Sequence, residues 1–168
     1  MFGKKRQNQP AERVSVEAGE PTENLTAIGR KVKTCPVTVI VPAYNEADCI
    51  ADTVNSLLEQ SLMPEAIIVI DDGSTDKTAE ICRSLGVTVI TPPENTGSKA
   101  GAQNYALSHI KTEYTLALDA DTTLKEDALE ALYNAMGTQD VVAACGFVIP
   151  QKVSTLWERG RYVEYLMA

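Results

Sequence analysis

Two short acidic strings contain the residue types best suited to chemistry in this chain. Asp71-Asp72-Gly73-Ser74 and Asp119-Ala120-Asp121 each follow directly on an apolar run. A buried strand that ends in carboxylates brings negative charge to the carboxyl edge of a sheet, where open α/β sheets bind their ligands. Carboxylates gathered there would repel the phosphates of a nucleotide unless a divalent cation lies between them. The two strings therefore indicate a metal-dependent site for a nucleotide or a nucleotide-sugar.

The spacing within each acidic string suggests different roles for its carboxylates. Asp119 and Asp121 are separated by one residue, so both can turn toward one ion, or one of them toward a ribose hydroxyl. Mg²⁺ and Mn²⁺ take oxygen ligands and bridge diphosphate oxygens. At Asp71-Asp72 a single carboxylate would suffice to shape a turn. The second carboxylate could accept the ring N–H of a pyrimidine and so select uracil over cytosine.

Two further segments add groups to the same edge. Pro42-Ala43-Tyr44-Asn45-Glu46 follows an apolar strand, which Pro42 is expected to end, and Asn45 can help to cap the next helix. Tyr44 can stack on a nucleobase there, although packing is the commoner role of a tyrosine. The loop 95–101 lacks both GxxxxGK[ST] and GxGxxG. It nevertheless opens a helix, so its N–H groups could meet an anion, with Lys99 as the cation or as an ordinary surface lysine.

Alternating elements must position these groups. The hydrophobic pattern predicts strands at 37–41, 66–70, 87–90, 114–118 and 141–149, and helices at 46–60, 74–85, 99–110, 125–136 and about 154–167. This alternation predicts an α/β fold with a mostly parallel sheet, right-handed crossovers and helices on both faces. Residues 1–34 are polar and are expected to be a disordered lead-in, with residues 35–168 as one domain.

Helical spacing also predicts which side chains face the sheet. The first helix is expected to pack through Ile50, Val54, Leu57 and Leu58, and the helix at 125–136 through Ala128, Ala131, Leu132 and Ala135.

Composition excludes several classes of protein. The formal charge is −8, and the first 34 residues carry seven Lys or Arg against four Glu, so the acidic excess lies in residues 35–168. An acidic body argues against nucleic acid as a partner. The four cysteines show no CxxC spacing, and the only histidine is His109, so a zinc site is not indicated. Cys82 and Cys145 fall in apolar segments and are expected to be buried thiols in a reducing cytosol.

Four motifs in this order resemble the family 2 glycosyltransferases of the GT-A fold: VTVIVPAYNE, VIDDGSTD, GSKAGAQNYAL and LALDADT. The resemblance covers residues 36–150. It implies a Rossmann-like GT-A sheet that binds a nucleotide-diphospho-sugar, usually UDP-linked. The implied reaction is the inverting transfer of a hexosyl or N-acetylhexosaminyl group to a saccharide or lipid-linked acceptor, with Mg²⁺ or Mn²⁺.

The resemblance also implies roles for individual residues. Tyr44 would lie against the uracil, Asp72 would accept its N3–H, and Lys99 would lie near the base or the phosphates. Asp119 would reach the ribose or the metal, and Asp121 would ligate the metal. The donor-binding residues that it implies are Pro42, Ala43, Tyr44, Glu46, Asp71, Asp72, Lys99, Asp119 and Ala120, with Asp119 and Asp121 as metal ligands.

The last residues carry a looser resemblance. Gly146–Pro150, followed by Trp157–Leu166, is similar to membrane-bound polysaccharide synthases of this family, which implies membrane association through a further segment and a location at the cytoplasmic face. In the family the catalytic base lies well beyond the DxD strand. We therefore expect a chain truncated before its acceptor half, with the donor site present and the base absent.

Two other functions stay open. A non-catalytic module that binds UDP or a UDP-sugar would share the same residues. A nucleotidyltransferase shares the α/β architecture and an acidic metal site, but it would carry a glycine-rich signature near the first strand. Pro42–Glu46 has none. A redox Rossmann enzyme is excluded on the same ground, because its first turn needs GxGxxG.

Overall fold

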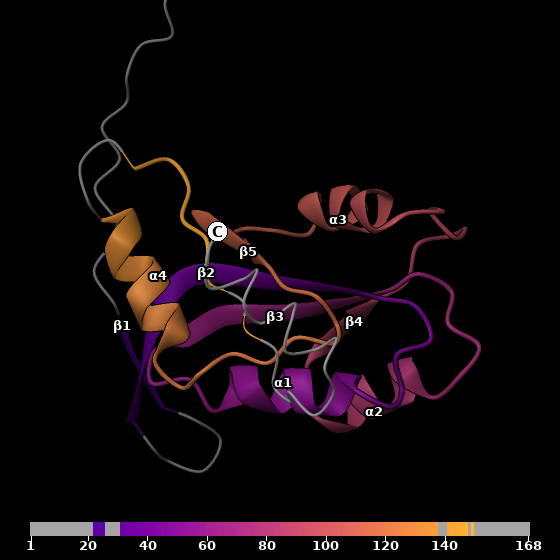
Figure 1. The fold of residues 1–168 in the computed structure, drawn as a ribbon, viewed down its shortest axis with the longest axis horizontal. Coiled ribbons are helices and arrows are strands. Elements are labelled where there is room, and N and C mark those ends of the chain that lie inside the picture. The colour runs from indigo at the N-terminus through magenta and orange to yellow at the C-terminus, as the bar shows by residue number, and fades with distance from the viewer. Residues whose placement is uncertain (1–21, 26–30, 138–140, 148, 150–168) are drawn as a thin grey trace, which may run out of the picture.

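The fold of the 168-residue chain is given by a computed structural model that describes residues 22–25, 31–137, 141–147 and 149 (Figure 1). Within these residues a five-stranded sheet is combined with four helices. The elements in chain order are β1 (Thr22–Leu25), β2 (Lys31–Ala43), α1 (Ile50–Leu58), β3 (Met63–Asp71), α2 (Thr78–Ser84), β4 (Thr88–Ile90), α3 (Lys99–Leu107), β5 (Tyr114–Ala117) and α4 (Ala128–Met136).

The order of the parallel strands reverses at β2. On one edge β2 pairs in parallel with β3, and β3 pairs with β4. The chain then returns, so that β5 pairs in parallel with the other edge of β2. In an open α/β sheet such a reversal leaves a crevice outside the carboxyl ends of the two strands that flank it. Here those strands are β2 and β5.

Helices cover both faces of the sheet, as the alternation of elements predicted. Successive strand residues point to opposite faces, so Val39 and Val41 join the core beneath α1, α2 and α4, while Ile40, Ile68 and Ile70 join the core beneath α3. Figure 1 shows α1 and α2 on one side of the sheet and α3 on the other. The predicted α/β fold is confirmed.

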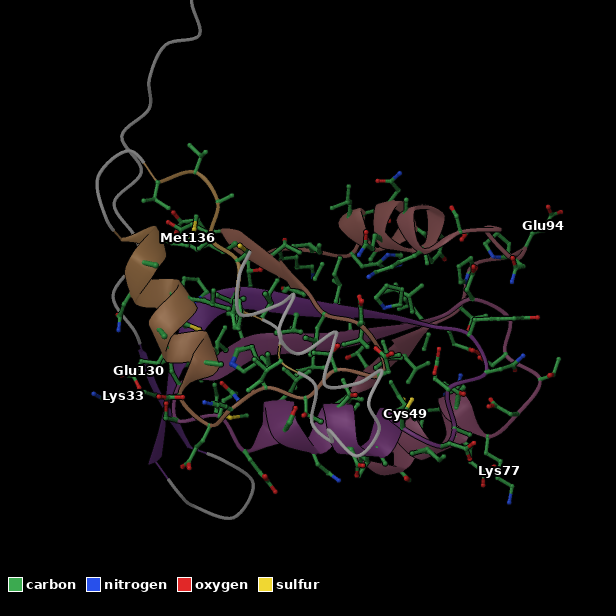
Figure 2. The ribbon with its side chains drawn as sticks, in the orientation of Figure 1. Lys33, Cys49, Lys77, Glu94, Glu130 and Met136 are labelled. Carbon is green, nitrogen blue, oxygen red and sulfur yellow. The ribbon has the colours of Figure 1, made fainter. Side chains whose placement is uncertain are left out.

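The two long strands, β2 and β3, run in the same direction through the centre of the sheet. Figure 2 shows Cys49, Lys77 and Glu94 at the end toward which the parallel strands run, with Lys33 and Glu130 at the opposite end. The loops that follow β2, β3 and β5 therefore meet at the end marked by Cys49.

The expected disordered lead-in is wrong at residues 22–25 and 31–34. β1 pairs antiparallel with residues 31–34 of β2. The pairing of β2 with β5 begins later in the strand, at Val37. The sequence of β1 lacks hydrophobic alternation. It forms a strand because its backbone N–H and C=O groups bond to an edge of β2 that is otherwise unpaired among the described residues. Residues 1–21 and 26–30 lie outside the described residues.

The strand predicted at 141–149 is also wrong in its described part. Residues 141–147 form no strand, and Val142 and Phe147 are exposed. An apolar run has high strand propensity, but a strand exists only through its hydrogen bonds to a neighbour. The helix predicted at 154–167 and the segment Trp157–Leu166 lie outside the described residues.

Two prolines lie within β2, and one of them corrects a prediction. β2 continues through Pro42 and ends at Ala43, so Pro42 does not end the strand. The register of β2 against β3 shifts between Cys35 and Thr38. Pro36 lies at this shift, as expected of a residue that cannot donate to the ladder.

The helix faces were predicted in part. Ile50, Val54 and Leu57 are fully buried as expected, whereas Leu58 is exposed. In α4 the inward side chains are Leu129 and Tyr133, not the alanine-rich stripe. The ring of Tyr133 packs edge-on against Tyr114 of β5, at 6.0 Å between ring centroids. Burial of the larger apolar area decides the rotation of the helix.

Candidate functional site

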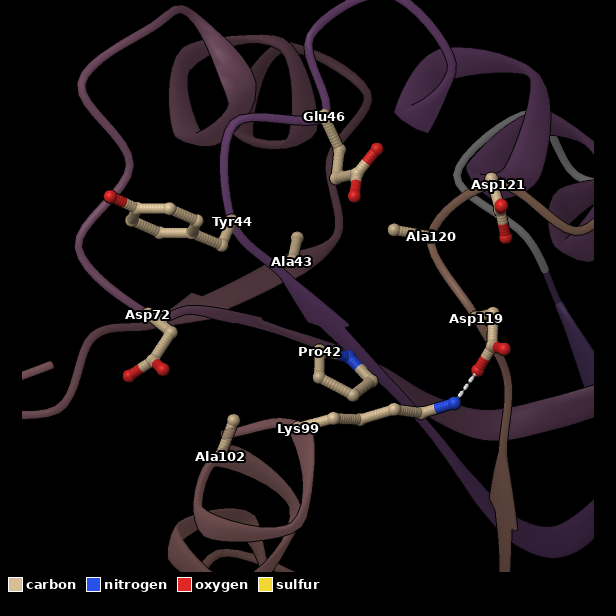
Figure 3. A pocket seen from close by; sticks show the side chains of 10 residues that line it. All are labelled: Pro42, Ala43, Tyr44, Glu46, Asp72, Lys99, Ala102, Asp119, Ala120 and Asp121. Atoms are coloured by element: carbon tan, nitrogen blue, oxygen red, sulfur yellow. Dashed lines mark hydrogen bonds and ion pairs between the residues drawn. The ribbon is translucent and has the colours of Figure 1, made fainter. Parts of the chain in front are cut away.

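The loops after β2 and β5 enclose a cleft of about 290 Å³ at the reversal of strand order, close to the lower limit of about 300 Å³ for small-molecule sites. Figure 3 shows Tyr44 and Asp72 toward one side of it and Asp119 and Asp121 toward the other, with Lys99 reaching toward Asp119. The residues that line the cleft are Pro42, Ala43, Tyr44, Glu46, Asp72, Lys99, Ala102, Asp119, Ala120 and Asp121.

Nine of the ten residues predicted for the site line this cleft, and Asp71 does not. Asp71 is buried, and its Oδ1 accepts the N–H of Ser74 at 3.1 Å, so this carboxylate shapes the turn while Asp72 faces the cleft. Ala102 was not predicted to line it. Ala102 lies three positions after Lys99 in α3, on the same helix face, and this spacing was the signal that could have found it.

Hydrogen bonds fix the turn after β2 against the turn after β3. Asn45 has a left-handed backbone with φ of 57°, which asparagine adopts more readily than most residues. Its side chain accepts from Thr75 and does not cap α1, contrary to expectation. The bonds between the turns are Thr75 N to Asn45 Oδ1 (2.7 Å), Asn45 N to Ser74 Oγ (3.0 Å), Glu46 N to Thr78 Oγ1 (2.8 Å) and Ala47 N to Asp76 Oδ2 (3.0 Å).

Hydrogen bonds at the two turns lower the pKa of Asp76 and fix the position of Tyr44. The hydroxyl of Thr78, followed by neighbouring backbone N–H groups, holds the pKa of Asp76 below its ordinary value. Asp72 N donates to Ala43 O at 2.9 Å. Tyr44, which is 53% exposed, is therefore held on a fixed turn beside Asp72 (Figure 3).

A buried hydrogen bond holds the segment after β5. The hydroxyl of Thr53, on α1, donates to Ala120 O at 2.7 Å, and Thr53 is fully buried. Ala120 lies between the two cleft carboxylates, Asp119 and Asp121. The bond therefore anchors both of them to the core.

Thr53→Val is expected to lower the free energy of unfolding by about 1–2 kcal/mol, because the buried carbonyl of Ala120 loses its donor while side-chain volume is kept. Urea unfolding measures the loss. Thr88→Val, at an exposed position in β4, is the matched control and should change the free energy by less than about 0.5 kcal/mol. Equal stability of the two variants would show that the Thr53 bond does not anchor the segment.

Lys99 and Asp119 form an ion pair across the cleft. Their side chains are 53% and 52% exposed, so solvent screens the pair and it adds little to stability. Lys99 begins α3, whose N-terminus is capped by Ser98, with Ser98 Oγ accepting Gly101 N at 3.1 Å. The cleft thus combines an ammonium group and a helix N-terminus with three aspartates and Glu46.

Cys49 precedes α1 and lies next to Glu46, one of the residues that line the cleft. Its thiol donates to Glu46 Oε2 at 3.2 Å. Burial raises the pKa of Cys49 to about 11, with further contributions from the hydrogen bond to Glu46 and the charges of Glu46 and Asp121. Burial likewise raises the pKa of Cys35 and of Cys82 to about 11. Cys145 is exposed, contrary to the prediction of a buried thiol.

Iodoacetamide at pH 8 is therefore expected to modify Cys145 well before the other three cysteines. A thiol with a pKa near 11 is thiolate in only about one molecule in a thousand at pH 8, and Cys35 and Cys82 are also buried. Peptide mass spectrometry over a time course measures the order. Rapid modification of Cys49 would contradict the placement of its thiol against Glu46.

The cleft carboxylates suit a cation held jointly with a ligand. Asp119 and Asp121 supply oxygen atoms, which Mg²⁺ and Mn²⁺ prefer. Among the described residues no group of three or more His, Cys, Asp or Glu could hold a metal ion. Two aspartates fit a cation that takes its other ligands from water and from the phosphates of a bound molecule. In the same part of the chain, no helix is long and apolar enough to cross a membrane.

Comparison with known proteins gives consistent matches. The family model described as Glycosyl transferase family 2 matches residues 38–166. Glycosyltransferase GlyG of Streptococcus pneumoniae serotype 4 is 33% identical over 114 residues, a stretch that covers 66% of this chain and 38% of that protein. The chain thus spans about two fifths of the length of this relative.

Two solved structures resemble the fold. S. aureus TarS 1–349 in complex with UDP-GlcNAc matches with a TM-score of 0.53 and 28% identity, covering 60% of this chain and 30% of TarS. The mannosyltransferase PcManGT from Pyrobaculum calidifontis, in complex with GDP-Man and Mn²⁺, matches with a TM-score of 0.53 and 32% identity, covering 64% of this chain and 33% of PcManGT.

Proposed function

Because this chain belongs to glycosyl transferase family 2, we propose that its cleft binds the nucleotide of a UDP-linked sugar donor for an inverting glycosyl transfer. The observation that carries the proposal is the meeting of Tyr44, Asp72, Lys99 and the pair Asp119 and Asp121 in one cleft at the reversal of strand order. An aromatic ring, a hydrogen-bond acceptor, a cation and two carboxylates that could share a metal ion are groups that suit the base and the diphosphate of a nucleotide.

The base end of the cleft is assigned to Tyr44 and Asp72. The exposed ring of Tyr44 offers a stacking surface for the base. The carboxylate of Asp72 accepts the N3–H of uracil, whereas cytosine has an acceptor at that position. Pro42 and Ala43 border the nucleoside from the end of β2.

The phosphate end is assigned to Lys99, Asp119 and Asp121. Asp121, with Asp119, would hold Mg²⁺ or Mn²⁺, and the bound ion would supply positive charge to the diphosphate. Lys99 adds its ammonium charge to the leaving group as the bond to the sugar breaks. Attack comes from an acceptor hydroxyl on the opposite side of the anomeric carbon.

The remaining assignments rest on the sequence resemblance alone. We place the catalytic base in a segment that follows the donor half, and we assign a saccharide or lipid-linked acceptor. On the same ground we place the protein at the cytoplasmic face of a membrane. The TarS complex contains UDP-GlcNAc and the PcManGT complex contains GDP-Man, so the base of the donor is the first property to measure.

Calorimetric titration of the purified chain with UDP, with and without Mn²⁺, tests the donor assignment, and GDP is the control. Saturable UDP binding that tightens with Mn²⁺ supports it. Tighter binding of GDP than of UDP would keep the nucleotide site and overturn the choice of UDP. Absence of nucleotide binding by a folded sample would overturn the donor site of this chain.

A further inference from the structure

Both oxygens of the Asp72 carboxylate already accept hydrogen bonds from a single residue. The backbone N–H of Thr96 donates to Oδ1 at 2.7 Å, and the hydroxyl of Thr96 donates to Oδ2 at 2.8 Å. Asp72 is only 7% exposed. The hydroxyl also lies 3.0 Å from Ser98 O, but a carboxylate is the stronger acceptor for its one hydrogen.

The loop after β4 is built to hold Thr96 in this position. Asn95 Nδ2 donates to Asp72 O, and Asn95 Oδ1 accepts Gly97 N at 2.7 Å. Gly97 has a φ of +72°, which few residues other than glycine adopt. A Cβ at Gly101 would lie 2.8 Å from both Cβ and Oγ1 of Thr96, so glycine at this position lets α3 approach the threonine.

Two donors from one residue occupy one edge of a carboxylate, in the way that a two-pronged donor binds it. Guanine presents such a pair of donors, its N1–H and its exocyclic N2–H₂. Uracil presents a single N–H, at N3. With Thr96 in place, the outer lone pairs of Asp72 can accept one further N–H, but the edge that guanine would need is taken.

We propose that Thr96 is a positioning residue that sets the base preference of the donor site for uracil over guanine by occupying the paired edge of Asp72. The proposal rests on the assignment of Asp72 to the base of the donor. Thr96 acts through Asp72 and does not line the cleft itself.

The test compares variants of Thr96 by calorimetric titration with UDP, GDP and CDP in the presence of Mn²⁺. Thr96→Val keeps the side-chain volume and removes the hydroxyl, so the carboxylate gains freedom to rotate. We expect the ratio of GDP to UDP dissociation constants to fall by about tenfold, a change of the size that one hydrogen bond to a charged group produces. Thr96→Ser keeps the hydroxyl and should stay within about twofold of the unmodified chain. Thr91→Val, at an exposed threonine of the same loop, is the matched control.

A second variant approaches the same contact from α3. Gly101→Ala keeps threonine at 96 and aspartate at 72, but the new Cβ would lie 2.8 Å from Cβ and Oγ1 of Thr96 and so displace that side chain. The ratio of GDP to UDP dissociation constants should therefore fall, as in Thr96→Val. Circular dichroism establishes that each variant is folded. A merely structural role of Thr96 would weaken UDP, GDP and CDP equally and leave the ratios unchanged.

The outcomes separate this inference from the proposed function. If the unmodified chain prefers UDP and both Thr96→Val and Gly101→Ala keep that preference, the role of Thr96 is overturned and the donor site stands. If the unmodified chain binds no nucleotide or prefers GDP, the assignment of a UDP donor fails and the role of Thr96 fails with it.

Discussion

Asp121→Asn is expected to lower the affinity of the chain for UDP in the presence of Mn²⁺ by about a hundredfold, or roughly 2.8 kcal/mol. The amide removes one of the two cleft-lining carboxylates that are proposed to hold the metal. Few protein ligands are available to a cation there, so the loss of one formal charge has a large effect. UDP affinity without Mn²⁺ should change by no more than about twofold, because the substitution leaves Tyr44 and Asp72, the residues proposed to contact the base, unchanged. Parallel titrations with and without Mn²⁺ measure both quantities.

Asp127→Asn is the matched control for this prediction. Asp127 is exposed, precedes α4 without capping it through its side chain and does not line the cleft, yet its substitution makes the same change in net charge. If Asp121→Asn and Asp127→Asn lowered the Mn²⁺-dependent affinity equally, net charge would explain the effect and the metal assignment of Asp121 would be wrong.

Gln60→Leu is expected to lower the free energy of unfolding by about 3 kcal/mol, because three hydrogen bonds are lost, one of them buried and two partly buried. Gln60 follows α1 and is 6% exposed. Its Nε2 donates to Ser56 O at 2.9 Å and to Lys125 O at 2.7 Å, and its Oε1 accepts Leu129 N at 2.9 Å. One amide thus joins the end of α1 to the start of α4. Leucine has similar volume and can replace none of these bonds.

Urea unfolding of the unmodified chain and of the Gln60→Leu variant measures the effect, and Asn104→Leu is the control. Asn104 is an exposed amide on α3, so its replacement should change the free energy of unfolding by less than about 0.5 kcal/mol. A loss below 1 kcal/mol for Gln60→Leu would show that water replaces the amide and that α4 is not held through Gln60.

The sequence predicted the strand ends well because the signal for them is local. An apolar run that ends just before Asp71 or Asp119 marks both a buried strand and its charged edge, and the parallel order of strands then brings those edges together. Nine of the predicted residues line the cleft, and all of them except Lys99, which begins α3, follow or end a strand. The same local signal could not distinguish Asp71 from Asp72, because only the folded turn decides which of the two carboxylates lines the cleft.

Features that depend on distant partners were missed. The bond between Thr96 and Asp72 and the bonds of Gln60 to α4 join residues far apart in the sequence, and no periodicity encodes them. β1 exists through pairing with an available edge, and the apolar run at 141–147 has no such pairing. In α4, the large side chains Leu129 and Tyr133 bury more apolar area than the alanine-rich stripe would, so they face the core. A prediction that only counts apolar positions gives an alanine the same weight as a leucine.

The return of β5 to the outer edge of β2 has a consequence for the order of folding. β2, β3 and β4 follow one another along the chain and pair with near neighbours, whereas Val37 finds Tyr114 only after the intervening chain is in place. Contacts between distant positions form slowly, because a long loop must close before they are made. We expect the side of the cleft that follows β2 and β3 to form early in folding. The side that carries Asp119 and Asp121 should form last. A nascent chain would therefore acquire Tyr44 and Asp72, the residues proposed to contact the base, before Asp119 and Asp121, the residues proposed to hold the metal.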